Sequence, residues 1–236
     1  MSFSTQRKLN ERWPGFEIAD DIDTVHTEDT GIVHAGRSVT AMQYQARTNG
    51  ATLKENHRVD KLTPDENGVV IETSKRKFHA KKVILAADAW VNKLLKSLGS
   101  EIPGMTVMQE QVTHFKPLDP ERYEPKNFPV WIWDLLKKLT KFMDTIIPAH
   151  GPELRTVTCQ YAITPDRQFI IGPLKKHPDI ILAQGNGHAF KFAPAIGRVA
   201  AELAIDGKTT EDISLFTVPD PNSSNPRPAP PGGSKL

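Results

Sequence analysis

Two short stretches in the C-terminal part of the chain contain most of the side chains that could perform chemistry. The stretch TVTCQYAITPDRQFIIG, at 156–172, holds Cys159, the single cysteine. The stretch AQGNGHAFKFAP, at 183–194, holds His188 and Lys191. A strand that ends in glycines and opens into a helix leaves unpaired N–H groups at the helix start, where the helix dipole also favours negative charge. The second stretch therefore predicts a place for an anion or an electron-rich group, although an ordinary strand–glycine–helix corner with a surface lysine would give the same pattern.

Cys159 on its own allows two interpretations. A lone cysteine inside an apolar strand is most often a small core residue. A nucleophilic thiol would need a general base and a group that orients the base. His188 is the only histidine nearby in sequence, and no acid is placed to orient it. The pattern therefore argues against a cysteine hydrolase and leaves a choice between a core thiol and a reactive or linking one.

Composition excludes several other classes. The 236 residues carry 30 Lys and Arg against 28 Asp and Glu, a net charge of +2 with no basic stripe, which argues against nucleic acid binding. No apolar run approaches the roughly 18 to 20 residues that span a bilayer, and the first residues lack the apolar core of a secretory signal. One cysteine excludes an internal disulfide framework, and the eight histidines are scattered, so no metal site is indicated. Neither GxGxxG nor GxxxxGK[ST] occurs. We expect an intracellular, soluble and globular chain of one large domain or two small ones.

The elements that must position these side chains follow an alternating pattern of helix and strand. The first half predicts a helix at 36–50, a strand at 51–62, a hairpin from 68–74 and 75–80, and a buried strand within 81–90 that leads into a helix at 91–99. The second half predicts strands at 105–117, 155–165, 167–172 and 179–185, an amphipathic helix at 135–147, and a helix at 188–208. The buried face of the last helix is expected at Ile196, Val199, Ala200 and Leu203.

Taken together, three segments resemble a known family. CQYAITPDRQFIIG, DIILAQGNGHAFKFAPAIGRVAAELAIDGKT and DISLFTV, at 159–172, 179–209 and 212–218, resemble the C-terminal part of FAD-dependent amine oxidases of the monomeric sarcosine oxidase type. That group includes peroxisomal sarcosine and pipecolate oxidases and N-methyltryptophan oxidases. NERWPGF, VILAADAWVNKLL and the EQVTHF strand follow the order of the family upstream, so the resemblance covers about residues 8 to 217.

The resemblance implies roles for the two stretches. It implies that FAD is attached covalently to Cys159 through an 8α-S-cysteinyl bond. Tyr161 would line the substrate pocket, Lys191 would pair with the carboxylate of an amino acid substrate, and His188 is implied as a third catalytic residue. The residues implied to border the cofactor are Val59, Ala86, Ala87, Gly185, Gly187, His188, Ala189, Phe190 and Lys191.

The resemblance also implies the fold: α/β with α+β two-layer elements, as an incomplete FAD-binding domain of the glutathione-reductase type with a remnant of an antiparallel substrate-domain sheet. The expected parts are a substrate-domain remnant at 1–30, an FAD-binding part at 31–100, a second substrate-domain remnant at 101–135, an FAD-binding part with the flavin-attachment segment at 136–218, and a mobile tail at 219–236.

The implied activity is oxidation of N-methyl or cyclic secondary amino acids, of the sarcosine or L-pipecolate type, to an imine with O₂ as acceptor and hydrogen peroxide as product. The family opens with a GxGxxG segment that holds the FAD pyrophosphate, and it has a longer, lysine-bearing stretch where Asp134 here meets Leu135. The resemblance therefore implies a truncated form with little activity. The alternative is a catalytically inactive fragment, or a module that carries flavin or binds a partner.

The end of the chain predicts a cellular location. The segment VPDPNSSNPRPAPPGGSKL has the composition of a disordered tail. Its last residues, Ser234, Lys235 and Leu236, match the tripeptide that the peroxisomal import receptor binds. A flexible spacer before such a tripeptide suits recognition by a receptor, so we expect the peroxisome.

Overall fold

The structure is a computed structural model that describes residues 2–4, 9, 11–14, 16, 24–131 and 150–219. The helix predicted at 135–147 lies outside these residues, and so does the predicted tail beyond Pro219. No helix within the described ranges is both long enough and apolar enough to cross a membrane.

The described residues fall into two compact units. The first takes its residues from Met1–His34 and Gln111–Thr158, and the second from Ala35–Glu110 and Cys159–Gly233. Within the described residues the chain thus changes unit after His34, after Glu110 and after Thr158. The bounds predicted for the domain parts stay a prediction. The assignment of these parts to an FAD-binding and a substrate domain stays a prediction.

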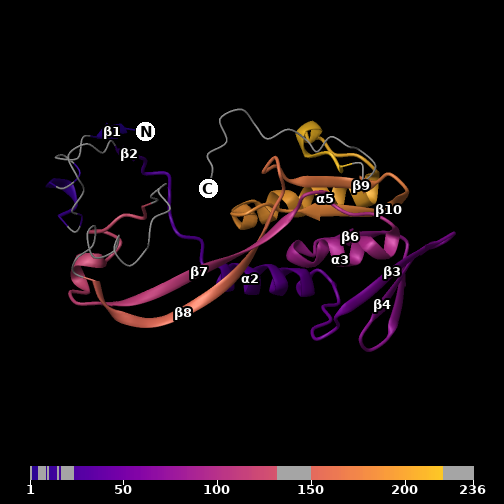
Figure 1. The fold of residues 1–236 in the computed structure, drawn as a ribbon, viewed down its shortest axis with the longest axis horizontal. Helices are drawn as coiled ribbons and strands as arrows, with labels where there is room; N and C mark the ends of the chain where they lie inside the picture. Colours follow the sequence, from indigo (N-terminus) through magenta and orange to yellow (C-terminus); the bar gives the residue numbers. More distant parts are fainter. Residues whose placement is uncertain are drawn as a thin grey trace. The chain divides into compact units, whose positions relative to one another are not determined.

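A three-stranded sheet lies at the centre of the second unit, in the order β6-β10-β9 (Figure 1). Strand β6 (Val83–Leu85) runs parallel to β10 (His177–Gln184), and β9 (Ile170–Leu174) pairs with β10 in the antiparallel direction. The apolar runs predicted within 81–90 and at 179–185 are therefore neighbouring strands, which is the arrangement expected of short, buried strands in an α/β sheet. Parallel strands of this kind place both of their carboxyl ends at one edge.

Helix α5 (Ala193–Asp206) packs against all three strands of this sheet. It carries a proline in its first turn and ends at Gly207, whose φ of 70° supplies the left-handed residue that commonly ends a helix. The predicted buried face is confirmed in part: Val199 and Ala200 are buried, whereas Ile196 and Leu203 are half-buried.

A second sheet in the same unit has the order β3-β4-β5, from β3 (Val59–Asp65), β4 (Gly68–Thr73) and β5 (Lys77–Ala80). The predicted hairpin is confirmed. The strand predicted at 51–62 is wrong over 51–58, which forms turns and loop. The polar stretch there includes Asn56 with a φ of 56°, a conformation that interrupts an extended strand.

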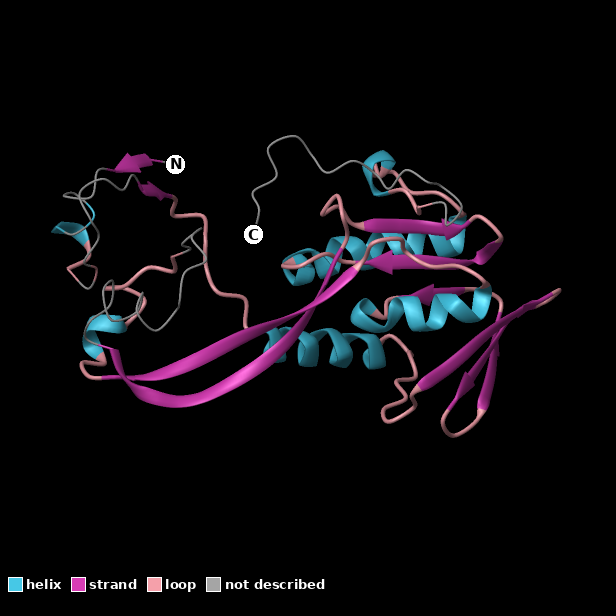
Figure 2. Cartoon of the chain, in the orientation of Figure 1, coloured by secondary structure: helices cyan, strands magenta, loops and turns pink. Residues whose placement is uncertain are grey.

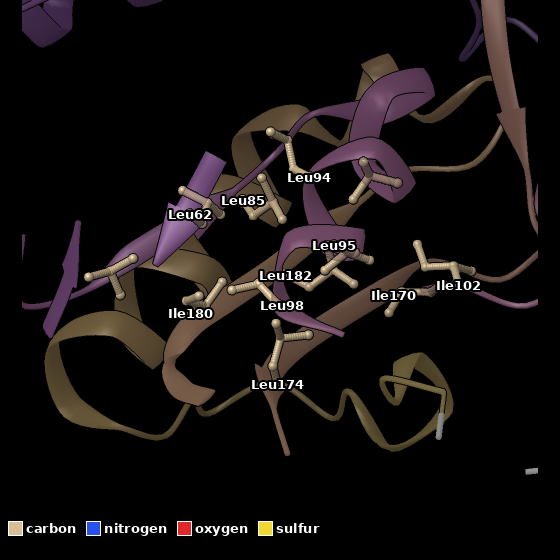
Figure 3. Close-up of a cluster of buried hydrophobic side chains, with 12 residues drawn as sticks. Leu62, Leu85, Leu94, Leu95, Leu98, Ile102, Ile170, Leu174, Ile180 and Leu182 are labelled. Atoms are coloured by element: carbon tan, nitrogen blue, oxygen red, sulfur yellow. The ribbon is translucent and has the colours of Figure 1, made fainter. Parts of the chain in front are cut away.

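The main hydrophobic core joins these two sheets through α3 (Val91–Leu95) and the short 3-10 helix η2 (Lys96–Leu98). Figure 3 shows that the side chains come from segments far apart in the sequence. The buried set is Leu62, Val69, Leu85, Val91, Leu94, Leu95, Leu98, Ile102, Ile170, Leu174, Ile180 and Leu182. Each large aliphatic side chain that is fully buried contributes about 1.5 to 3 kcal/mol, so this core is what fixes the edge where β6 and β10 end.

The other described strands form two separate pairs (Figure 2). Strands β7 (Thr106–Pro117) and β8 (His150–Ile163) form a two-stranded ribbon, and β1 (Ser2–Ser4) pairs with β2 (Thr24–His26). Helix α2 (Ala35–Thr48) has no buried residue and is followed by Gly50 with a φ of 87°. The strand predicted at 105–117 and the helix predicted at 36–50 are both confirmed.

Candidate functional site

The site predicted from sequence lies at the carboxyl edge of the β6–β10 pair. Residues 86–88 follow β6, and residues 185–188 follow β10. In open α/β sheets, ligands bind outside the carboxyl ends of parallel strands. The edge therefore brings the predicted cofactor residues Ala86 and Ala87 into the same region of the sheet as the glycine loop.

The glycine loop, which we define as residues 185–188, is closely packed. A Cβ atom on Gly185 would lie 2.7 Å from the Cβ of Ala189, closer than real contacts allow. Gly187 has a φ of 50°, and its N–H donates a 3.1 Å hydrogen bond to the carbonyl of Ala162 on β8. Glycine at these two positions thus lets the loop contact the end of β8, which is the strand that carries Cys159.

The predicted helix start at this loop is wrong. A 3-10 turn, η4 (Ala189–Phe192), follows the loop, and α5 begins only at Ala193. Proline is favoured in the first turn of a helix, and Pro194 holds that place here. The N-terminal dipole of α5 therefore does not lie at the glycines, and the predicted anion site has to rest on side chains instead.

Tyr161 and His188 are brought into direct contact by the loop. The Tyr161 hydroxyl lies 3.3 Å from His188 Nδ1, and the two rings meet edge to face with centroids 5.2 Å apart at 82°. Burial raises the pKa of the Tyr161 hydroxyl, and the nearby Cys159 and Glu110 raise this pKa further. The phenol is consequently protonated at neutral pH and can donate a hydrogen bond.

Cys159 is exposed, so its interpretation as a core residue is wrong. Its thiol donates a 3.8 Å hydrogen bond to the carbonyl of Gln160. Strand β8 belongs to a two-stranded ribbon, and such a ribbon does not bury both of its faces. Because successive strand residues point to opposite faces, Cys159 and Tyr161 lie on the same face. The structure therefore places an accessible thiol beside the Tyr161–His188 pair.

Lys191 lies in η4, which directly follows the glycine loop. Its Nζ donates a 3.1 Å hydrogen bond to the carbonyl of His188 and lies 5.1 Å from the centre of the Phe192 ring. The side chain is exposed, and an ammonium group in this position could approach the carboxylate of a small ligand. Phe190, predicted to border the cofactor, is 38% exposed.

A buried polar network binds the glycine loop to the turn after β8. The sequence analysis did not predict this network. Asn186 Nδ2 donates a 2.7 Å hydrogen bond to Thr164 Oγ1, and that hydroxyl donates to the carbonyl of Gln168 at 3.0 Å. Thr164 is 1% exposed. Asp166, in the same turn, accepts the N–H of Gln168 at 3.1 Å. The Thr-Pro-Asp turn was visible in the sequence, but its partner Asn186 was not.

Gln184 and Asp88 were also missed, although they join the two strand ends. Gln184 is the last residue of β10 and is fully buried. Its Nε2 donates to Asp88 Oδ1 and to the Gly185 carbonyl, both at 3.0 Å. Its Oε1 is buried without a hydrogen-bond partner among the described residues. A polar residue at the end of an apolar strand was the signal that could have found it.

Val59 lies elsewhere in the unit. It is half-buried at the start of β3 and packs against the main core. Ala86 is exposed, whereas Ala87 also packs against the core. The resemblance implies that Val59 contacts the adenosine half of FAD and that Ala86 and Ala87 lie where a strand end passes the cofactor. These roles stay predictions.

The residues present fit a flavin. The loop follows β10 at the carboxyl edge, where α/β sheets bind ligands, and it carries no side chain at Gly185 or Gly187. The neighbouring Tyr161–His188 pair and Lys191 supply polar groups, and the orphaned Gln184 oxygen provides an acceptor at the same edge. The exposed Cys159 thiol is available for attachment.

Comparison with known proteins supports this class. The solved L-proline dehydrogenase of P. horikoshii has the same fold, with a TM-score of 0.77 over 92% of this chain and 67% of its own, at 23% identity. The family model described as FAD dependent oxidoreductase (DAO) matches residues 2–137 and 128–203. The chain therefore belongs to the DAO family of FAD dependent oxidoreductases, and its fold class is the one predicted from the sequence.

Two curated relatives fall in the group that the sequence resembled. The monomeric sarcosine oxidase of Bacillus sp. strain NS-129 is 28% identical over 90% of this chain. The N-methyl-L-tryptophan oxidase of Salmonella dublin is 27% identical over 88% of this chain. The chain spans 66% of the length of each relative. The resemblance to the sarcosine oxidase family is thus confirmed.

Proposed function

We propose that this chain forms the flavin-ring and substrate side of an FAD-dependent amine oxidase that acts on N-methyl or cyclic secondary amino acids, of the sarcosine or L-pipecolate type. The hydrogen bond from the Gly187 N–H to the Ala162 carbonyl carries the proposal, because it holds the glycine loop against β8. That contact puts His188 on Tyr161, two residues from Cys159. Family membership and the names of the relatives support the same class.

FAD is the cofactor that these residues would hold. When bound, it would accept a hydride from the carbon next to the amine nitrogen, give an imine, and pass two electrons to O₂ to form hydrogen peroxide. Cys159 would hold the flavin by a thioether bond to its 8α carbon. Formation of this bond would remove the thiol hydrogen and one methyl hydrogen, and O₂ would accept the two electrons.

The protein side chains would then bind and orient the substrate. The Lys191 ammonium would pair with the substrate carboxylate, and its hydrogen bond to the His188 carbonyl keeps it at the loop. Tyr161 would donate its hydroxyl proton to a substrate oxygen or nitrogen, since its raised pKa keeps that proton in place at neutral pH. His188 would fix the orientation of the phenol ring through its edge-to-face contact.

Reconstitution tests the cofactor assignment. The full chain would be incubated with FAD, desalted and precipitated with acid. We expect yellow protein and a mass increase of one FAD, both lost in C159S. The matched control is T156S, on the same strand. Colourless wild-type protein after reconstitution would contradict the proposal.

A substrate assay tests the rest. A carboxylated amine is titrated into the flavin-loaded chain, and the change in flavin absorbance gives its dissociation constant. In K191M this dissociation constant should rise about tenfold or more, because a charge-assisted contact is lost. Peroxide release with sarcosine and L-pipecolate measures turnover by the same preparation. The low oxidase activity expected from the resemblance stays a prediction that this assay tests, and yellow protein without turnover would agree with the flavin-carrying alternative.

We also propose import into the peroxisome through Ser234, Lys235 and Leu236, which lie outside the described residues. Peroxide production suits that compartment because catalase resides there. A fluorescent protein fused before residue 1 should form puncta that coincide with catalase, and removal of the three residues should make the signal diffuse. Diffuse signal from the intact fusion would contradict the proposal.

A further inference from the structure

Asp88 has an unusual backbone conformation at the carboxyl edge. It follows β6 and begins the 3-10 turn η1 (Asp88–Trp90), with a φ of 40°. Side chains other than glycine rarely adopt this left-handed region, because Cβ approaches the following carbonyl oxygen. Strain of this kind persists where the surrounding structure enforces it, and such positions cluster at ligand sites.

Gln184 binds the carboxylate of Asp88. The amide of Gln184 is fully buried, and its Nε2 lies 3.0 Å from Asp88 Oδ1. This bond joins residues 96 positions apart and links the ends of the two parallel strands. The same amide leaves Oε1 buried without a partner among the described residues, although a buried acceptor is normally satisfied. We call this hydrogen bond between Gln184 and Asp88 the Gln184–Asp88 clasp. It holds the Asp88 carboxylate, while the buried Oε1 lowers the stability of the fold.

The held group has a definite chemistry. A carboxylate accepts hydrogen bonds and repels phosphate, and one bond to Gln184 leaves most of its acceptor capacity for other donors. Asp88 is exposed, so a ligand can approach it. A partner must therefore present hydroxyl or amine hydrogens. FAD presents hydroxyl groups at two places, on the ribityl chain and on the ribose.

We propose that Asp88 is a cofactor-positioning residue whose carboxylate accepts hydrogen bonds from hydroxyl groups of FAD, and that Gln184 orients this carboxylate. The inference rests on the proposed function. It assigns the carboxyl edge to the hydroxyl-bearing part of the cofactor, and the glycine loop remains the border of the flavin ring.

Binding measurements on four chains test the proposal. D88N keeps the shape and tolerates the left-handed backbone, but removes the negative charge and one acceptor oxygen. D88G removes the side chain and relieves the backbone. D179N is the matched control, because Asp179 lies near the amino end of the same β6–β10 pair. Each chain, and the wild type, is titrated with FAD, with FMN, which has only the ribityl chain, and with ADP, which has only the ribose.

We expect D88N and D88G to weaken FAD binding on the order of tenfold or more, as loss of a charge-assisted hydrogen bond should. In the same variants, the binding of either FMN or ADP should weaken in parallel. Weaker FMN binding would identify the ribityl hydroxyls as the bound groups, and weaker ADP binding would identify the ribose hydroxyls. D179N should bind all three as the wild type does. Without ligand, D88G should melt at a higher temperature than the wild type, since it loses strain that ligand binding requires.

Two results would overturn the inference. Wild-type affinity for FAD in both D88N and D88G, with a lower melting temperature in D88G, would show that the clasp is structural only, while the proposed function would stand. A wild-type chain that binds none of the three probes would contradict the proposed function and this inference together.

Discussion

The two ends of the β6–β10 pair are closed in different ways. At the amino end, Lys82 Nζ lies 2.6 Å from Asp179 Oδ1, and the two side chains are 45% and 41% exposed. At the carboxyl end, the buried amide of Gln184 binds an Asp88 that has a left-handed backbone. One end thus uses an exposed ion pair. The other uses a buried amide whose oxygen has no hydrogen-bond partner in the described part of the chain.

The difference shows where the molecule accepts unfavourable features. An exposed ion pair contributes about 0.2 to 1 kcal/mol and leaves the local backbone unstrained. The carboxyl end concentrates a strained residue, a buried oxygen without a partner among the described residues, a glycine with no room for a Cβ at 185, and a glycine with a left-handed backbone at 187. Features of this kind gather at functional sites. The contrast therefore points to the carboxyl edge as the working end of the sheet.

The largest effect is expected from Leu182→Ala, because this substitution should destabilise the β6–β10 pair itself. Leu182 is fully buried in the middle of β10 and belongs to the main core. Truncating it should lower the free energy of unfolding by about 2 to 5 kcal/mol, from lost burial and a cavity. Urea denaturation measures the change. Ile84→Ala on β6 is the control, because Ile84 is 43% exposed and should cost about 1 kcal/mol or less. Equal losses in the two variants would contradict the assignment of the core.

The carboxyl end alone should respond to Gly185→Ala. The new Cβ would lie 2.7 Å from the Cβ of Ala189, so the loop must move, at a cost of about 1 to 3 kcal/mol. We also expect loss of FAD binding, because the displaced loop carries His188. Gly197→Ala is the matched control: no atom lies within 4 Å of its added Cβ, and alanine in a helix interior should stabilise by about 0.5 to 1 kcal/mol. Retained stability and FAD affinity in Gly185→Ala would remove the packing argument for the loop.

Much of this edge could be predicted from local sequence. Short apolar runs predicted β6 and β10, because that signal lies within a few residues, whereas the glycines predicted a helix start that the structure places at Ala193. The family resemblance named Tyr161 and His188 as site residues, but their contact was not predicted. The two residues are 27 positions apart, and strands β9 and β10 lie between them. A local sequence pattern does not predict a contact over that distance.

The missed features depend on tertiary structure in the same way. The Gln184–Asp88 clasp joins strands that are distant in sequence, and the left-handed backbone of Asp88 has no signal in the alanines around it. The exposure of Cys159 depends on β8 lying in a two-stranded ribbon, and an apolar pattern alone cannot distinguish such a ribbon from a buried strand.

The amino end should respond weakly to loss of its ion pair. A double-mutant cycle of Lys82→Met and Asp179→Asn should give a coupling energy of about 0.2 to 1 kcal/mol, because both side chains are largely solvated. Repeating the cycle at about 1 M salt should reduce the coupling, since the screening length falls to about 3 Å. A coupling above about 2 kcal/mol that resists salt would show that the two ends are more alike than the structure implies.

The smallest effect should appear at alkaline pH and only at the carboxyl end. The folded-state pKa of Tyr161 is raised, mainly by burial, above the value of about 10 that an unfolded chain shows. The folded state therefore keeps a proton that the unfolded state loses, and the stability that Tyr161 contributes is complete below about pH 10 and is lost as the pH rises through the folded pKa. Tyr161→Phe should consequently lose melting temperature less steeply than the wild type above about pH 10.

Tyr44→Phe is the matched control for this titration, because Tyr44 is 68% exposed on α2. Its melting curve should follow the wild type at every pH. The effect in Tyr161→Phe should be small, since that side chain is only partly buried and solvent screens its charge. If Tyr161→Phe and the wild type fall in parallel, the phenol does not sit in the environment that the glycine loop and His188 create, and the polar asymmetry between the two ends of the sheet would then rest on Gln184 and Asp88 alone.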